Sequence, residues 1–542
     1  MMLWSVEKYF AAMKPGRISF QNCEVNRLMK WTYRLCSSLL LLLFFVPSSS
    51  LALIGSPSGQ LVGPPSGPWK INARQVQFLD QLEKDTFSYF WDSTDPRNGL
   101  TPDRFPGDSE SSVAAVGFSL TSYLVGVERH YITRAEAAAR TLTTLRTLAD
   151  GPQGPATSNV NGYKGFYYHF LDMKTGLRAN RSELSTIDTA LLMAGVLSAQ
   201  TYFDADNPTE AQIRTIADNL YRRIDWPWFY DRKHQPLLSM GWYPENGFGS
   251  AYWGGYNEGM ILYILALGSP SHPIAGDSWA KWTGSYRWDT FYNYPFVNFG
   301  PLFAYQYSHA WIDFRAIQDG YMQAKGIDYF TNSRRATYAS RAYCIANPGG
   351  WRGYGQQVWG LTACDGPGEP VIGKESDGRV FYRYWARGTG AGYRNDDGTI
   401  APTAVGGSIP FAPEITIPTL QYLKERFGGR LYGKYGFKDA FNLSFRTPAA
   451  AHGWFDNQYI AIDQGPILLM TENYRTGFIW NLMKNNKYIR NGLVRAGFTG
   501  GWLGTEVAAD KPAGHPSSAK ESNALPEEKP ADAQPGKPDA KA

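Results

Sequence analysis

Apolar residues along most of the chain recur at the spacing of an α-helix. Val76, Leu79, Leu82, Phe87 and Phe90 follow one another at intervals of 3, 3, 5 and 3 residues. At about 100° per residue, all five fall on one helix face. Similar patterns predict further helices, and the predicted segments are 113–127, 184–203, 255–267, 309–325, 329–346, 415–427 and 464–484. Strand-like alternation is scarce, so the pattern predicts an all-α protein.

Local signals mark several of the predicted helix ends. Thr133 and Glu136 have the spacing of a capping box, which predicts the start of a helix. Asn207 and Pro208 provide a cap and a proline start for a helix that ends near Ile224. Gly428 closes the segment 415–427. The apolar pattern and the end signals therefore agree.

We expect these helices to form a ring. About ten to twelve helices without a heptad repeat, joined by long aromatic loops, favour an (α/α)6 toroid, a barrel of six helical hairpins, over residues 72–505. In a toroid, the N-terminal ends of the inner helices and the loops above them form a broad cleft. The alternative is an irregular helical bundle. The long loops at 226–254, 268–308 and 347–412 count against it, because loops of that length are usually functional.

Residues 1–52 contain an upstream extension and a secretory signal. A basic stretch begins at Met29, residues 39–46 are apolar, and Ser50-Leu51-Ala52 has the pattern of a cleavage site. A retained membrane anchor is the weaker alternative, because the apolar run is too short to span a bilayer. We therefore expect a periplasmic or secreted protein without a membrane anchor after cleavage.

The composition of the two flanking segments predicts that they do not pack. Residues 53–71 are expected to be a linker, and residues 506–542, rich in Ala, Pro, Lys and Glu, a disordered tail. Cys344 and Cys364 remain in the mature chain. They either form a disulfide, which an oxidising compartment would permit, or are two buried free thiols.

Composition and charge narrow the function. Aromatic residues make up 15% of the chain, and their rings suit the apolar faces of sugars, although a large core uses aromatic residues too. The net charge of +5 and the lack of a dense basic run argue against nucleic-acid binding. The scattered His and the spacing of the Cys argue against a metal site, and no motif predicts a cofactor. We expect a monomer that binds a glucan or an oligosaccharide.

Glu258 is the first candidate for sugar chemistry. Hydrolysis of a glycosidic bond needs two carboxyl groups, one to protonate the leaving oxygen and one to activate water or attack carbon. Glu258 lies among aromatic and glycine residues in the segment 252–260. Such semi-apolar surroundings raise the pKa of a carboxyl group, as a general acid requires. The alternative is an ordinary charge in the first turn of a helix.

Three aspartates are further candidates for catalysis. Asp188 lies at the head of a very apolar helix, where it is paired, capping or catalytic. Asp456 and Asp463 lie in a polar and aromatic segment late in the chain. Asp463, just before Gln-Gly-Pro, also suits the position of an N-cap.

Other residues near these acids are candidates for substrate contacts. Asp365 lies in an Asp-Gly-Pro-Gly sequence, which is also ordinary turn chemistry. His309 belongs to a polar and aromatic cluster, although a lone histidine is more often structural. The predicted substrate-binding residues are Trp253, Tyr256, Asn257, Tyr307, His309, Trp311, Trp359, Asp365 and Arg387.

Four long motifs carry a resemblance to a known family. Residues 252–274, 298–315, 358–368 and 463–480 resemble the glycoamylase-like domain of bacterial endo-β-1,2-glucanases, glycoside hydrolase family 144, and more distantly of cyclic β-1,2-glucan synthases. The resemblance covers residues 75–500. It implies an (α/α)6 toroid, a β-1,2-glucan substrate, no metal, and inversion at the anomeric carbon.

The same resemblance implies roles for the acids. Glu258 is similar to the general acid, and Asp463, with Asp456 close by, to the general base. Asp188 falls where the glucanases carry an acidic residue before an apolar helix. This chain reads Ser185-Thr-Ile-Asp188 where those enzymes tend to have Asp-x-x-Glu, so one carboxylate is missing and endo or exo action stays open. The alternatives are a glucoamylase-like hydrolase of another glucan and a non-catalytic glucan-binding protein.

Overall fold

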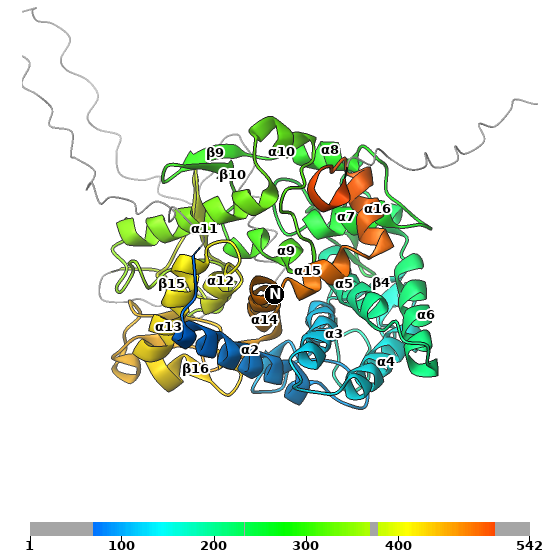
Figure 1. The fold of residues 1–542 in the computed structure, drawn as a ribbon, viewed down its shortest axis with the longest axis horizontal. Coiled ribbons are helices and arrows are strands. Elements are labelled where there is room, and N and C mark those ends of the chain that lie inside the picture. The colour runs from blue at the N-terminus through cyan, green and yellow to red at the C-terminus, as the bar shows by residue number, and fades with distance from the viewer. Residues whose placement is uncertain (1–68, 232, 369–377, 505–542) are drawn as a thin grey trace, which may run out of the picture.

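The computed structural model describes residues 69–231, 233–368 and 378–504 (Figure 1). The predicted signal, nearly all of the predicted linker and the predicted tail lie outside the described residues. Among the helices that are described, none combines the length and apolar character needed to cross a membrane.

Most of the regular structure is helical, as the apolar pattern predicts. The α-helices are α2 (Ala73–Ser93), α3 (Val113–Glu128), α4 (Arg134–Asp150), α5 (Thr186–Tyr202), α6 (Pro208–Arg222), α7 (Met260–Gly268), α8 (Ser278–Thr283), α9 (Tyr307–Trp311), α10 (Gly320–Lys325), α11 (Tyr329–Ala346), α12 (Pro402–Gly406), α13 (Pro413–Phe427), α14 (Ala461–Arg475), α15 (Phe478–Met483) and α16 (Lys487–Arg495). Short 3-10 helices are η1 (Trp226–Phe229), η2 (Leu302–Tyr305), η3 (Gly428–Arg430), η4 (Pro448–Ala450) and η5 (Gly501–Leu503).

The strands are short and pair in small antiparallel sheets. They are β1 (Arg104–Phe105), β2 (Ser111–Ser112), β3 (Gly162–Tyr163), β4 (Phe166–Tyr167), β5 (Phe170–Leu171), β6 (Leu184–Ser185), β7 (Gly241–Tyr243), β8 (Gly247–Phe248), β9 (Trp288–Phe291), β10 (Tyr294–Val297), β11 (Ala363–Cys364), β12 (Trp385–Ala386), β13 (Gly388–Gly390), β14 (Tyr393–Asn395), β15 (Thr399–Ile400), β16 (Tyr432–Gly433), β17 (Gly436–Phe437), β18 (Phe441–Asn442), β19 (Trp454–Phe455) and β20 (Tyr459–Ile460).

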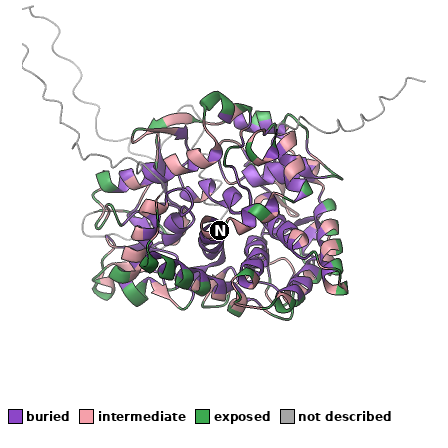
Figure 2. Cartoon of the chain, in the orientation of Figure 1, coloured by how far each residue is buried: buried purple, intermediate pink, exposed green. Residues whose placement is uncertain are grey.

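A set of largely buried helices forms the interior. Their side chains are almost all buried, and the helices are α3, α5, α7, α9, α12 and α14 (Figure 2). Along this set α3 packs on α5, α5 on α7, α7 on α9, α9 on α14, α12 on α14, and α14 on α3. Gln306, just before α9, donates to the carbonyl of Ala404 in α12 at 2.8 Å. The interior is thus built from helices that are buried on almost every side.

More amphipathic helices cover this interior. α2 packs on α14 and α3, α4 and α6 pack on each other and on α3 and α5, and α16 packs on α7. α13 packs on α12, and α11 on the η2 segment before α9. In Figure 1, α14 and α9 lie near the middle of the view, and α2, α4, α6 and α13 lie towards its edge. The prediction of a helical fold is confirmed at this level.

Short sheets hold the N-terminal ends of the interior helices. β2 leads into α3 and pairs with β5, and β6 leads into α5 and pairs with β7. β20 leads into α14 and pairs with β1, and β15, which shortly precedes α12, pairs with β18. The loops above these helix ends are therefore tied to one another by backbone hydrogen bonds.

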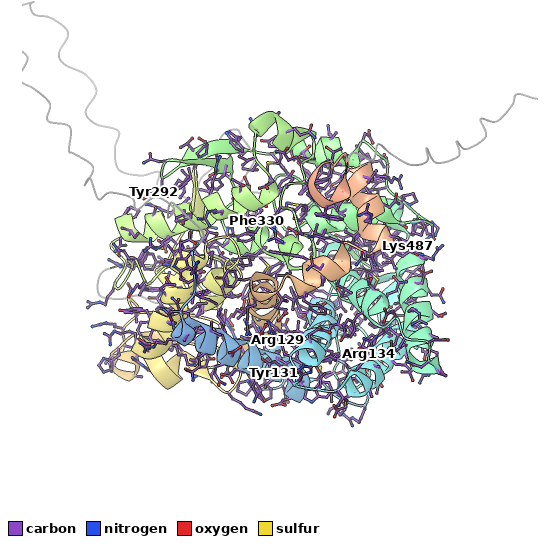
Figure 3. The ribbon with its side chains drawn as sticks, in the orientation of Figure 1. Arg129, Tyr131, Arg134, Tyr292, Phe330 and Lys487 are labelled. Atoms are coloured by element: carbon purple, nitrogen blue, oxygen red, sulfur yellow. The ribbon has the colours of Figure 1, made fainter. Side chains whose placement is uncertain are left out.

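Charged side chains join the C-terminal ends of α3 and α14 to the middle of α2. Arg129, labelled in Figure 3, directly follows α3. Its Nε lies 2.6 Å from Glu472 in α14 and 3.2 Å from Glu83 in α2. Arg475 also pairs with Glu83. This network closes the contact between α2, α3 and α14 at the end away from the short sheets.

Several predicted helix ends are correct and others are wrong. The capping box of Thr133 and Glu136 opens α4, and Asn207 caps α6. The predicted helix 309–325 is two helices, because the chain is extended at Ile312 and Asp319 caps the second one. The predicted helix 464–484 is α14 and α15, separated at Gly477, whose φ of 70° interrupts the helix.

The structure also tests the predictions made for Asp463 and for the two cysteines. Asp463 is not an N-cap, because α14 begins two residues earlier, at Ala461, after the extended Ile460. Cys344 and Cys364 are both buried and free. The two cysteines are therefore buried free thiols and do not form a disulfide with each other.

Candidate active site

A cavity of about 110 Å³ lies at the N-terminal ends of the interior helices. Its wall combines the first turn of α5, the turn before α7, the start of α9 and the start of α14 with the strands β11 and β12. The residues that line it are His169, Glu183, Ser185, Ile187, Asp188, Leu191, Met240, Trp253, Glu258, Phe303, Tyr307, Ala363, Tyr384, Ala386 and Ile462. Several acids and aromatic rings from distant parts of the chain therefore meet in one place.

Glu258 lies in the turn that precedes α7 and projects into this cavity. The side-chain oxygen Oε2 is buried and has no hydrogen-bond partner among the described residues. Burial raises the pKa of Glu258 to about 8, and the negative charge of Asp188 adds to the rise. The carboxyl group is therefore protonated at neutral pH and can donate a proton inside the cavity.

Asp188 lies in the first turn of α5 and is held by its neighbours. Ser185, the N-cap of α5, donates its hydroxyl to Oδ2 of Asp188. Nε2 of His169 lies 3.6 Å from the other carboxylate oxygen, and Nδ1 of His169 lies 2.8 Å from Glu183. Burial lowers the pKa of His169, but the charges of Asp188 and Glu183 outweigh it and raise that pKa to about 9. The histidine is thus a cation between two acids.

Asp463 lies in the first turn of α14, directly after Ile462, which lines the cavity. It is buried, and burial raises its pKa. Its carboxyl group interacts directly with that of Asp439, whose pKa is also raised by burial and by the charge of Asp463. Oδ2 of Asp463 and Oδ1 of Asp439 have no hydrogen-bond donor among the described residues. A negative charge on either group therefore disfavours ionisation of the other.

Asp365 and Asp456 extend this pair into an aspartate cluster, which we define as Asp365, Asp439, Asp456 and Asp463. Carboxylate oxygens of Asp365, Asp439 and Asp456 lie within 4.8 Å of one another, a spacing that could hold a metal ion. Arg104 forms an ion pair with Asp365 and so provides a positive charge at this cluster. Carboxylate oxygens are ligands that divalent cations take, but the positive charge of Arg104 already offsets part of the negative charge here.

Tyr384 and Tyr307 lie close to the charges of the aspartate cluster. Both line the cavity, and the guanidinium of Arg104 lies 5.7 Å from the ring centre of Tyr384. The hydroxyl of Tyr307 donates to the carbonyl of Ile462 at 3.0 Å. Burial raises the pKa of Tyr307, and so do Asp463 and Glu258, whose charges both act on it. The charges of both candidate catalytic acids therefore act on the Tyr307 hydroxyl.

Of the predicted substrate-binding residues, Trp253 and Tyr307 line the cavity. The indole of Trp253 donates to Thr186 at 2.8 Å, which fixes the ring as a wall. Asp365 lies in the aspartate cluster instead. The remaining predicted residues are buried and do not line this cavity, and they are Tyr256, Asn257, His309, Trp311, Trp359 and Arg387.

Each of these core residues has its polar group bonded within the protein or enclosed by rings. Asn257 accepts from the amide of Gly259 and donates to the carbonyl of Gly254, so it closes the turn that carries Glu258. Burial lowers the pKa of His309 to about 3, which leaves it neutral. Trp311 and Trp359 donate their indole N–H to threonines.

Tyr256 and Arg387 complete this set. The Tyr256 ring packs 5.0 Å from that of Tyr305, between centroids, with no exposure to the cavity. Arg387 pairs with Asp397 at 2.7 Å in the fully buried interior. Tyr256 lies two residues before Glu258, and Arg387 directly follows Ala386, which lines the cavity. Both therefore lie beside the site without lining it.

Sequence reasoning missed several residues of the site. His169, Glu183 and Tyr384 line the cavity, and Arg104 and Asp439 belong to the aspartate cluster or pair with it. His169 lies in an aromatic segment, 166–170, of the kind that drew attention to Glu258. That local signal could have found His169. No local pattern distinguishes Arg104 or Asp439 from surface charges.

Comparisons with known proteins give a consistent set of relatives. The family model Glycoamylase, described as "putative glucoamylase", matches residues 250–487. A solved structure of the same description from Bacteroides uniformis is 35% identical, with a TM-score of 0.68, and the match covers 80% of this chain and 100% of that one. The endo-β-1,2-glucanase of Chitinophaga pinensis, solved with sophorotriose and glucose, is 28% identical, with a TM-score of 0.68, over 80% of this chain and 100% of that one.

A curated relative adds a named activity. The exo β-1,2-glucooligosaccharide sophorohydrolase of Parabacteroides distasonis is 30% identical over 77% of this chain. The chain spans 57% of the length of that relative.

Proposed function

Because the chain belongs to the glycoamylase-like family of glycoside hydrolases, family 144, we propose that it cleaves β-1,2-glucan to sophorose-series oligosaccharides by an inverting acid–base mechanism. The observation that carries the proposal is Glu258, whose carboxyl group lines the cavity with Oε2 buried and without a hydrogen-bond partner among the described residues. A buried carboxyl group in that setting keeps its proton until a leaving group takes it.

The roles of the acids follow from their surroundings. Glu258 protonates the glycosidic oxygen as the bond to the anomeric carbon breaks. The pair of Asp463 and Asp439, which does not line the cavity, accepts the proton of the attacking water through a sugar hydroxyl beside Tyr307. Asp188, whose charged form His169 and Ser185 stabilise against the effect of burial, accepts hydrogen bonds from sugar hydroxyls and stabilises the positive charge that develops on the ring.

We also propose that the interior helices are the inner helices of an (α/α)6 toroid. The sequence of contacts from α3 through α5, α7 and α9 to α14 and back to α3 supports this arrangement. Gln306 supports it further, since it links the α9 segment to α12. The cavity lies at the N-terminal ends of these helices, where a toroid would have its cleft.

Export is a further proposal. The basic and apolar segments that follow Met29 and the small residues at 50–52 support it. A periplasmic or secreted enzyme would meet glucan outside the cytoplasm. Mass spectrometry of the mature chain would test this, because cleavage after Ala52 predicts Leu53 as the first residue.

The product profile tests the proposed function. Purified protein is incubated in parallel with linear β-1,2-glucan, starch, laminarin and cellulose. Sophorose-series products from β-1,2-glucan alone are expected, and sophorose as the sole product from the start would identify exo action. Release of glucose from starch, or binding of glucan without any product, would contradict the proposal. NMR of freshly released sugar should show the inverted anomer.

A further inference from the structure

The turn Tyr382–Trp385 connects the cavity with the protein surface. Tyr384 lines the cavity, while Tyr382, two residues earlier, has 42% of its surface exposed. Tyr382 is the most exposed large hydrophobic side chain among the described residues. Its ring centre lies 4.0 Å from that of the half-buried Trp385, with 32° between the ring planes. The turn thus has one aromatic ring inside and two paired rings outside.

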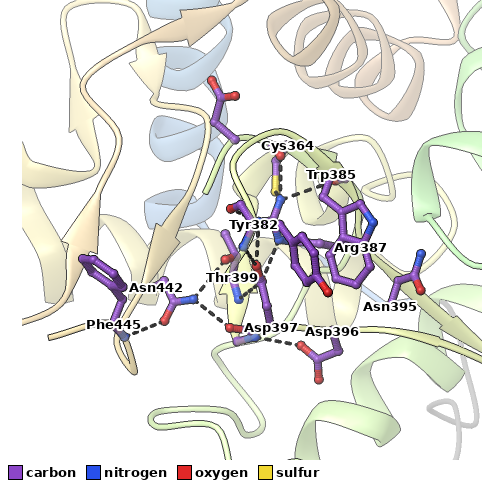
Figure 4. Close-up of polar contacts among 12 residues, drawn as sticks. Cys364, Tyr382, Trp385, Arg387, Asn395, Asp396, Asp397, Thr399, Asn442 and Phe445 are labelled. Carbon is purple, nitrogen blue, oxygen red and sulfur yellow. Dashed lines mark hydrogen bonds and ion pairs between the residues drawn. The ribbon is translucent and has the colours of Figure 1, made fainter. Parts of the chain in front are cut away.

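Arg387 holds the backbone of this turn in place (Figure 4). Its guanidinium is completely buried and donates to the carbonyl oxygens of Tyr382 at 2.9 Å, Arg383 at 3.2 Å and Trp385 at 3.4 Å. Asp397 pairs with the same guanidinium and accepts from the amide of Tyr382 at 3.0 Å. A buried ion pair that satisfies this many backbone groups makes the turn rigid.

The geometry points to a second sugar-binding subsite on the Tyr382–Trp385 pair, outside the cavity, for glucosyl units of the same glucan chain. This inference rests on the proposed function, because it takes β-1,2-glucan as the ligand. The flat apolar face of a glucopyranose packs on an aromatic face, while its hydroxyls remain in water. A rigid pair of rings binds with little loss of conformational entropy.

A glucan chain suits this pair better than a protein partner does. The exposed surface consists of one ring and part of another, together with Val380, which is 38% exposed. Stable protein interfaces bury far more, about 800 Å² on each side. The pair also adjoins Tyr384 and Ala386, which line the cavity. A chain with one bond at Glu258 can therefore continue along the turn to the outer rings.

Chain-length dependence of the kinetics tests the inference. We would measure kcat and KM of Trp385→Ala and Tyr382→Ala on long linear β-1,2-glucan and on the shortest sophorose-series oligosaccharide that wild type cleaves. KM on the long glucan is expected to rise about fivefold, as for the loss of a buried aromatic contact. The value of kcat, and both constants on the short substrate, should stay unchanged. Trp385→Phe should retain most of the affinity for the long glucan.

Trp502→Ala is the matched control. Trp502 is also half-buried and beside cationic side chains, but its indole donates to the carbonyl of Asp313, just beyond the C-terminal end of α9. It therefore lies at the end of the interior helices opposite the cavity, and its loss should change KM for neither substrate.

Two results would overturn the inference: an unchanged KM on long glucan in both variants, or equal losses on long and short substrates. Wild-type protein that hydrolyses neither substrate would instead refute the proposed function. Calorimetric titration with long glucan would then still test whether the subsite binds glucan. Weaker binding by Trp385→Ala than by wild type would support it, and equal binding would refute it.

Discussion

The two ends of the interior helices both bury acidic side chains, but they surround them differently. At the C-terminal ends of α3 and α14, Glu83 and Glu472 lie against Arg129, and Glu83 also pairs with Arg475. At the N-terminal ends, Glu258 enters a cavity, and the charge that acts on it is the negative one of Asp188. Glu83 and Glu472 therefore contact cations, whereas the charge that acts on Glu258 is another carboxylate.

The comparison shows that a raised pKa alone does not identify a catalytic acid. Burial and the neighbouring Glu472 raise the pKa of Glu83 as well, against the effect of its two arginines. What distinguishes Glu258 is access to the cavity and the charge beside it, because Asp188 acts on Glu258 whereas two arginines pair with Glu83. The charge network holds helices together, whereas the cavity acid remains available to a ligand.

The largest effect on activity is expected from Glu258→Gln. Loss of the general acid should lower kcat on β-1,2-glucan by about 10³-fold or more, while glucan affinity stays within a few-fold of wild type. Reducing-sugar release and calorimetry measure the two quantities. Glu83→Gln, which changes an acid at the opposite end, should leave kcat unchanged. Retained turnover in Glu258→Gln would move the role of the acid to another residue.

Asp463→Asn should lower kcat by about 10²-fold, because an amide cannot accept the proton of the attacking water. Asp319→Asn is a matched control, since Asp319 is buried and accepts hydrogen bonds from Trp279 and Tyr329 outside the cavity. We expect that control to alter stability and not kcat. If Asp463→Asn lowers only the melting temperature, Asp463 has a structural role alone.

The pH profile of wild-type kcat/KM should report Glu258. The protonated carboxyl group is the active form and its pKa is raised to about 8, so activity should fall about tenfold per pH unit above that value. Asp188→Asn removes the negative charge beside Glu258 and should move this alkaline limb to lower pH. An alkaline limb that is absent up to pH 10, with the fold intact by circular dichroism, would contradict the assignment.

The smallest effect on activity is expected from Arg129→Met. Removing this cation leaves two buried carboxyl groups with less compensation and should cost about 3 kcal/mol of stability, with kcat unchanged. Urea denaturation measures the stability. Arg97→Met, which removes an exposed ion pair with Asp95, should leave the urea midpoint unchanged. A loss of kcat in Arg129→Met would mean that the two ends are coupled.

Prediction from the sequence worked best where neighbouring residues decide the structure. The predicted helix 329–346 agrees with α11 at both ends, and the cap at Asn207 and the capping box at Thr133 are as predicted. The segment 309–325 was wrong because a turn interrupts its apolar pattern, with Ala316 at a φ of 60°. Burial against distant helices stabilises that turn, and no periodicity within the segment reveals it.

The candidate site was predictable only in part, because contacts between distant segments decide which side chains reach the cavity. Glu258, Asp188, Trp253 and Tyr307 were predicted from local motifs or from the resemblance, and all four line the cavity. Trp311 and Trp359 come from equally aromatic motifs, yet both are completely buried in the core. Sequence pattern identifies aromatic segments, and it does not distinguish the side of a helix that faces a cavity from the side that faces a neighbour.

The sequence by itself determined the helical segments, many of their caps and the family, because these depend on residues close together in the chain or on long motifs in a set order. The tertiary structure alone decided which acids have a cation beside them. Arg104 reaches Asp365, and Arg129 reaches Glu472, across hundreds of residues of chain. Since charge, burial and proton affinity depend on distances in space, the chemistry of these acids is settled only when the helices pack.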